Sequence, residues 1–148
     1  MNPQTQKENY YALKEMARAQ FIKEDREKDL YTECVLLQEL NHTQIIGFYG
    51  AHRDRRANKV FFLLEYCPKS SLFEFLKATR SLQTNLAKHF TAELVVALEY
   101  LRTMEIVHRD LKPGNVVLDK KNHLKLIDFA TCKVFNERLS KQINALYS

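Results

Sequence analysis

The stretch HRDLKPGN at residues 108–115 joins an acid, a base and an amide around one proline–glycine turn. A second acid follows in the triplet DFA at residues 128–130, beyond a segment with the pattern of a β-hairpin. A single Asp in a sequence is usually a helix cap or a surface charge. Several such residues in this order and at this spacing favour a functional site over a purely structural explanation.

The two stretches resemble the catalytic loop and the metal-binding triplet of protein kinases. The resemblance implies transfer of the γ-phosphoryl group of ATP, with Mg²⁺, to a protein hydroxyl. Asp110 would orient that hydroxyl, and Lys112 would stabilise the γ-phosphate. Asn115 and Asp128 would bind Mg²⁺, which prefers hard oxygen ligands. Catalysis is thus assigned to Asp110, Lys112 and Asn115, and metal binding to Asn115 and Asp128.

The resemblance extends upstream, to the strand that carries the phosphate-binding lysine. YALK at residues 11–14 is similar to the family's V-A-I-K strand, which makes Lys14 the lysine that contacts the α- and β-phosphates. Its partner would be a glutamate on the next helix, and Glu33 fits that position. By itself Lys14 would be taken for an ordinary exposed lysine. Together with Glu33 and the later motifs, it is predicted to contact phosphate.

Further residues are assigned to the nucleotide by resemblance alone. Ala12 and Val117 would enclose the adenine, and Leu64 would guard the back of the pocket. Glu65 and Cys67 fall at the hinge, where backbone groups bind adenine. The apolar stack that runs between the family's lobes is matched by Leu37, Phe48, His108 and Phe129.

Ser71 falls where the family often has an acidic ribose ligand. The spacing S-L-F-E at residues 71–74 is also that of a capping box, and a helix cap is the preferred interpretation. The assigned ATP-binding set is Lys14, Glu33, Ala12, Leu64, Glu65, Cys67, Ser71, Val117 and Asp128.

The hydrophobic pattern predicts an α+β fold. Strands are expected at residues 10–13, 45–49, 60–66, 116–118 and 124–127. Helices are expected at about residues 23–40, directly after Ser71 and at about residues 86–101, while the tail from Asn136 is polar and is assigned no element. The resemblance implies one partial kinase domain over residues 1–148. Residues 10–66 would be an incomplete N-lobe sheet with helix C, and residues 67–148 the hinge, the first part of the helical C-lobe, the catalytic loop and the start of the activation segment.

Composition narrows the class of protein. The chain has 148 residues, of which 45% are hydrophobic, enough for a core. The net charge of +5 permits anionic partners, but the basic residues near Arg55 and Arg56 are interpreted as a solvated hairpin loop, so no nucleic-acid partner is expected. Three scattered cysteines suggest a reducing compartment. Neither a signal peptide nor a membrane span is predicted, and the expected location is the cytoplasm or the nucleus.

The sequence departs from the family pattern in three places. No glycine precedes Lys14, so the glycine-rich phosphate loop is missing. Ala130 replaces the glycine of the metal-binding triplet, and alanine costs about 1 kcal/mol where a positive φ is needed. The match covers only about half of a catalytic domain, so the chain is expected to be truncated at both ends. The apolar face of the helix around Leu94 would then be exposed, and the chain marginally stable.

Three functions are weighed. Lys112 favours the serine/threonine branch, and TAEL with ALEYL at residues 91–101 is similar to the AGC group, most of all to phosphoinositide-dependent protein kinases. The main prediction is therefore a segment of an ATP-dependent serine/threonine protein kinase with protein substrates. The alternative is a pseudokinase-like binding module or inactive fragment that engages a partner through the helix C and hairpin surface. A small-molecule phosphotransferase is disfavoured by the complete catalytic-loop string.

Overall fold

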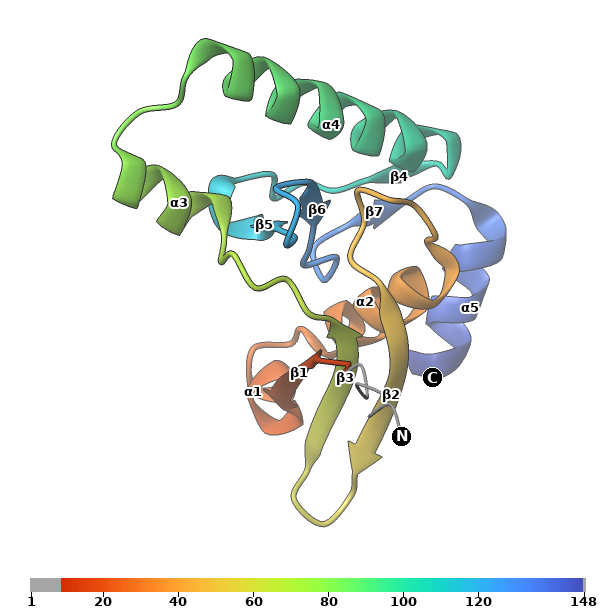
Figure 1. Cartoon of the computed structure of the whole chain (residues 1–148). Helices are drawn as coiled ribbons and strands as arrows, with labels where there is room; N and C mark the ends of the chain where they lie inside the picture. The colour runs from red at the N-terminus through yellow and green to blue at the C-terminus, as the bar shows by residue number, and fades with distance from the viewer. Residues whose placement is uncertain (1–8, 148) are drawn as a thin grey trace, which may run out of the picture.

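The computed structural model describes residues 9–147, so residues 1–8 and Ser148 lie outside the described part of the chain. The expectation of no signal peptide concerns this N-terminal segment. The described chain is α+β, which confirms the predicted class. A sheet and its helices form one part, and a long helix with two short antiparallel strand pairs forms the other (Figure 1).

Three antiparallel strands form the sheet, namely β1 (Tyr11–Ala17), β2 (Phe48–Asp54) and β3 (Lys59–Glu65), with β3 in the centre. β1 is longer than predicted because it pairs with β3 along its whole length. β2 starts later than predicted because Ile45 leaves the sheet and bridges to Leu126 of the other part.

The predicted helix at residues 23–40 corresponds to α2 (Glu27–Glu39), which starts four residues later than expected. A short helix that was not predicted, α1 (Arg18–Lys23), precedes it, and Asp25, with a φ of 54°, separates the two. A left-handed residue interrupts the helical hydrogen bonds, and Asp tolerates that conformation better than most residues. The guanidinium of Arg18 bridges the break to Glu27, with Nε and Oε1 2.7 Å apart.

The second part follows the predicted order. It contains α3 (Leu72–Thr79), α4 (Thr84–Thr103), the 3₁₀ turn η1 (Pro113–Asn115) and the hairpin of β5 (Val116–Leu118) and β6 (Leu124–Leu126). The strand pair of β4 (Ile106–Val107) and β7 (Lys133–Val134) was not predicted, because two-residue strands leave no periodic pattern.

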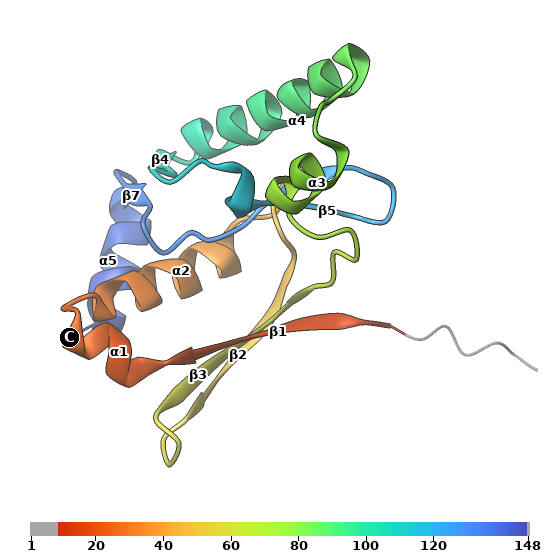
Figure 2. The same cartoon turned by 90° about the vertical axis from the view of Figure 1, so that its left-hand side faces the viewer.

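The polar tail folds into α5 (Glu137–Tyr147), which lies along α2 (Figure 2). Asn136 Oδ1 accepts a hydrogen bond from the backbone N of Leu139 at 3.2 Å and so caps the helix. Leu139 and Ile143, one turn apart, are the buried residues of α5. Only these two apolar positions mark the buried face, which explains why the sequence gave the tail no predicted element.

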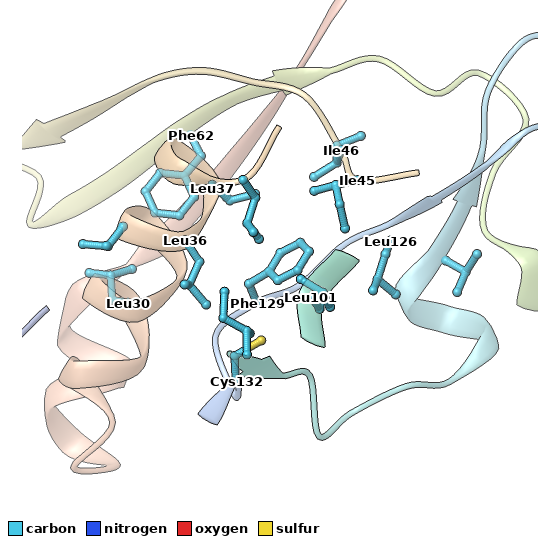
Figure 3. Close-up of a cluster of buried hydrophobic side chains, with 14 of the residues drawn as sticks. Leu30, Leu36, Leu37, Ile45, Ile46, Phe62, Leu101, Leu126, Phe129 and Cys132 are labelled. Atoms are coloured by element: carbon cyan, nitrogen blue, oxygen red, sulfur yellow. The ribbon is translucent and has the colours of Figure 1, made fainter. Parts of the chain in front are cut away.

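One hydrophobic core joins the two parts. Leu36 of α2, Phe62 of β3 and Phe129 are all fully buried in it (Figure 3). Leu101 of α4 and Leu126 of β6 contribute from the other side. The catalytic-loop and triplet segments are thus anchored to the same core as the sheet.

The apolar stripe of α4 around Leu94 was expected to be exposed, but Phe90, Ala97 and Leu101 are buried in the core and Leu94 packs against it. Other apolar side chains of α4 face outward. Val95, Val96 and Leu98 are 57%, 46% and 37% exposed. No helix within residues 9–147 has both the length and the apolar character needed to cross a bilayer.

Candidate active site

A cavity of about 390 Å³ lies where the sheet, α2 and the β5–β6 hairpin meet. Of the nine residues assigned to ATP, eight line it: Ala12, Lys14, Glu33, Leu64, Glu65, Cys67, Val117 and Asp128. Asn115, assigned to the metal, also lines it. Residues from both ends of the described chain therefore converge on one cavity of a size typical of small-molecule sites.

Lys14 and Glu33 form an ion pair inside this cavity. Lys14 Nζ lies 2.6 Å from Glu33 Oε1 and 2.8 Å from Oε2. Glu33 is only 2% exposed, and burial raises the pKa of its carboxyl group although the Lys14 ammonium acts in the opposite direction. β1 supplies the lysine and α2 the glutamate, so the pair also ties the helix to the sheet.

The Asp128 carboxylate faces the same lysine. Its Oδ1 lies 3.9 Å from Lys14 Nζ, and its backbone has a φ of 65°. The next residue, Phe129, is fully buried and contacts the His108 ring edge-on, with ring centroids 5.3 Å apart. This packing fixes the side of the backbone to which Asp128 points.

The expected cost of Ala130 does not arise in this structure. Ala130 is buried and is not among the residues with positive φ. The left-handed residue of the triplet is Asp128, which as an aspartate tolerates that conformation more easily than alanine would. The replacement of glycine is therefore compatible with the observed triplet.

The catalytic-loop side chains form one hydrogen-bonded group. Lys112 Nζ lies 2.6 Å from Asp110 Oδ2, and Asn115 Nδ2 donates to the backbone O and to Oδ2 of Asp110 at 2.9 and 2.8 Å. The hydrogen bond from Lys112, assisted by Asn115, lowers the pKa of the Asp110 carboxyl group. The η1 turn brings Asn115 back to Asp110, as predicted from the proline and glycine. Since the amide nitrogen of Asn115 is engaged with Asp110, its oxygen is the atom that can face a cation.

The His108 ring holds this loop in place through two hydrogen bonds. Its Nε2 lies 3.1 Å from the Ile127 carbonyl O, and Asp110 N donates to Nδ1 at 3.3 Å. One donor and one acceptor nitrogen describe a neutral imidazole. Burial lowers the pKa of His108 accordingly.

Arg109 was not assigned a role from the sequence. Its backbone has a φ of 68°, and its Nε donates to the Thr131 carbonyl at 2.6 Å. This contact holds the segment after the triplet against the catalytic loop. The only signal in the sequence that could have identified Arg109 is its position inside the 108–115 motif.

Glu65, assigned to the hinge by resemblance, joins other parts of the chain through its side chain. Its Oε2 accepts a hydrogen bond from Gly47 N at 3.1 Å and lies 2.9 Å from Lys125 Nζ. Neither partner was identified from the sequence, because long-range side-chain pairs leave no local pattern. Nearby, burial raises the pKa of the Cys67 thiol to about 11.

Ser71 is the one assigned ATP residue that does not line the cavity. Its Oγ accepts a hydrogen bond from Glu74 N at 3.3 Å and caps α3. The preferred interpretation as a helix cap is confirmed. Conversely, the sequence gave no role to three residues that line the cavity, Ile46, Tyr66 and Ile127. Tyr66 and Ile127 adjoin assigned residues, which is the one signal that could have found them.

The comparisons with known proteins agree with this geometry. Residues 3–146 match the family model described as a protein kinase domain. A cAMP-dependent protein kinase, catalytic subunit-like, of Caenorhabditis briggsae is 33% identical, with 87% of this chain and 33% of the relative covered. The 3-phosphoinositide-dependent protein kinase B of Dictyostelium discoideum is 37% identical over 83% of this chain and 13% of its own length. The serine/threonine-protein kinase Sgk1 of Gallus gallus is 35% identical over 85% of this chain and 29% of its own length.

The chain spans a third or less of the length of these three relatives. All three relatives are similar to this chain over most of its length. They are kinases of the AGC type, the group that the sequence was expected to resemble. The chain belongs to the protein kinase family and resembles its serine/threonine kinases.

Proposed function

We propose that this chain forms the nucleotide site of a serine/threonine protein kinase that transfers the γ-phosphoryl group of ATP to protein hydroxyls. The observation that carries the proposal is the convergence of Lys14, Asn115 and Asp128 on one cavity, with the Lys14–Glu33 pair formed. Ala12, Leu64 and Val117 supply apolar walls that suit an adenine ring.

The donor set also fits a magnesium ion. Asn115 offers an amide oxygen and Asp128 a carboxylate, both hard ligands, and both line the cavity. When bound, Mg²⁺ neutralises charge that develops on the transferred phosphoryl group. Lys14 would bind the α- and β-phosphates, and Glu33 would keep its ammonium group in place.

The reaction that we propose uses Asp110 and Lys112. Asp110 would orient the substrate hydroxyl and accept its proton as the hydroxyl oxygen bonds to the γ-phosphorus and the bond to the ADP oxygen breaks. The Asp110 carboxyl group is ionised at neutral pH, and the hydrogen bond from Lys112, which lowers its pKa further, favours that charged, hydrogen-bond-accepting form. Lys112, 2.6 Å away, would offset the charge on the γ-phosphate.

The alternative is a binding module that does not turn over. One observation favours it: a groove of about 320 Å³ beside α2 and the β2–β3 hairpin offers a docking surface. That groove is lined in part by Cys34, His52 and Val60. A reducing, intracellular location is proposed for either function, supported by three free cysteines.

One experiment separates the two functions. Mg-ATP is added to the purified chain, and both the melting temperature and phosphate transfer to a serine/threonine peptide are measured. The kinase proposal expects stabilisation with transfer, and it expects Asp110→Asn to abolish transfer but keep the stabilisation. Glu137→Gln, a change at an exposed acid of α5, is the matched control. Stabilisation without transfer supports the binding module, and no effect of Mg-ATP contradicts a nucleotide site.

A further inference from the structure

Two histidines and a glutamate meet outside the nucleotide cavity. His89 and Glu93 lie one turn apart on α4, and His123 lies in the β5–β6 turn that α4 covers (Figure 1). One ligand atom from each of the three lies within 4.8 Å of the other two. None of the three lines the cavity assigned to ATP.

Glu93 is the fixed member of this cluster. Its carboxylate is 8% exposed, and Oε2 accepts a hydrogen bond from Leu124 N at 2.8 Å. Oε1 lies 2.6 Å from His123 Nδ1. The His123 backbone is itself held, because its N donates to Asp119 Oδ1 at 2.8 Å. Metal ligands in proteins are commonly held in place by hydrogen bonds from neighbouring groups, and the backbone N of Leu124 holds the Glu93 carboxylate in this way.

Both imidazoles of the cluster are exposed to solvent. The side chains of His89 and His123 are 48% and 47% exposed, and their ring centroids are 5.7 Å apart. His89 Nε2 lies 3.5 Å from Glu93 Oε1. An ion could therefore reach the three atoms from solvent and keep water in its remaining positions.

The two separations that involve Glu93 are close to those that a tetrahedral ion imposes. Zinc bonds of about 2.0–2.2 Å place neighbouring ligand atoms roughly 3.3 Å apart. The contact from His89 to Glu93 at 3.5 Å already matches this value. The contact from His123 to Glu93, at 2.6 Å, is a hydrogen bond that must open by less than about 1 Å as the ion replaces the shared proton.

We propose that His89, Glu93 and His123 form a site for Zn²⁺ or a similar late first-row divalent ion. Two imidazoles and one carboxylate are a donor set that suits these metals better than Mg²⁺ or Ca²⁺, which take oxygen ligands. The ion would join α4 to the β5–β6 hairpin, the hairpin that leads from Asn115 to Asp128. On binding, His123 Nδ1 would give up its proton and, in a neutral ring, Nε2 would take one up from solvent, so that His123 binds the ion as a neutral imidazole.

The test uses the full chain without a polyhistidine tag. Co²⁺ is titrated in and followed by its visible absorption, and Zn²⁺ is then used to displace it. The expected result is one saturable site, with affinity lowered at least about tenfold in His89→Ala and in His123→Ala. His52→Ala, at an exposed histidine of β2, should bind as the unmodified chain does.

His89→Ala is the decisive variant. Ala favours a helix, and the only contact of His89 with the carboxylate is the 3.5 Å approach, so this change should leave the fold intact. His123→Ala removes the hydrogen bond to Glu93 and is accepted only with an unchanged circular dichroism spectrum. The proposal is overturned if Co²⁺ shows no saturable binding, or if His89→Ala leaves the binding unchanged. The three side chains would then be a hydrogen-bonded cluster that holds no metal.

Discussion

Lys14 Nζ and Asp128 Oδ1 lie 3.9 Å apart, although most of the described chain separates the two residues in sequence. Glu33 contacts the same lysine at 2.6 Å. The single cation therefore interacts with a buried carboxylate and with a more exposed one. Its charge offsets the cost of burying Glu33 and gives an anionic phosphate a partner in the same place.

Lys14→Met should destabilise the chain as well as weaken nucleotide binding. The change leaves the buried Glu33 carboxylate without its partner, which costs about 2 kcal/mol. A lower melting temperature of the chain without nucleotide checks this. Adding Glu33→Gln to Lys14→Met should recover most of the stability, because a neutral amide is less costly to bury, but no Mg-ATP binding. A chain with Lys14→Met that melts with the parent would contradict a contribution from the pair.

The stability of the chain should fall as the pH drops below about 6.5, in part because of His108. Burial lowers the pKa of His108 in the folded chain from the ordinary value of 6.5, so the unfolded chain takes up the proton first. Proton uptake by the unfolded state favours unfolding as the pH falls. Urea unfolding across pH 5.5–7.5 measures the slope. His108→Phe should flatten it.

His52→Phe provides the control for the slope, because His52 is an exposed histidine of β2. It should keep the pH dependence of the parent chain. Each variant is compared with the parent at the same pH, so that Glu33, whose raised pKa acts in the opposite direction, contributes equally to both. An unchanged slope in His108→Phe would mean that this imidazole does not stay neutral in the fold.

Gly47→Ala should be harmful, and Gly50→Ala should be tolerated. A Cβ at Gly47 would lie 3.2 Å from Oε2 and 3.3 Å from Cβ of Glu65, so the hinge residue would have to move. Such crowding costs about 1–3 kcal/mol. A Cβ at Gly50 meets nothing within 4 Å. Thermal melts and Mg-ATP binding of the two variants, measured side by side, check the difference.

The exposed apolar face of α4 should cause self-association. Replacing Val95 and Val96 with Lys and Glu removes apolar surface at positions that are about half exposed, so the free energy of unfolding should change by less than about 0.5 kcal/mol. Sedimentation velocity should show less oligomer for the double variant at the same concentration. Leu101→Ala, on the buried side of the same helix, should instead lower stability by about 2–5 kcal/mol. Equal sedimentation of parent and double variant would argue against an adhesive face.

Those parts of the site that rest on local motifs could be predicted from the sequence. The return of Asn115 to Asp110 follows from the turn between them, and the Ser71 cap follows from the spacing to Glu74. The Lys14–Glu33 contact could be anticipated only because two separate motifs resembled one family.

The rest depends on contacts that have no local pattern. The bond from Lys125 to Glu65 joins residues far apart in the chain, and either residue alone reads as a surface charge. Asp25, through its left-handed backbone, moves the start of the predicted helix to Glu27 and separates it from α1, and the pattern of the flanking residues does not show this. Burial in three dimensions, rather than sequence spacing, determines these features.

The packing of α5 on α2 links the C-terminal helix to the helix that carries Glu33. It buries Leu139 and Ile143 beside α2, and Arg138 Nη2 lies 2.8 Å from Glu39 Oε2 at the end of that helix. α2 also carries Glu33, so the same helix holds the carboxylate of the candidate nucleotide site and the surface on which α5 packs. If α5 and the Lys14–Glu33 pair both favour this orientation of α2, each stabilises the other by the same coupling free energy. Removal of α5 should then also weaken the Lys14–Glu33 contact.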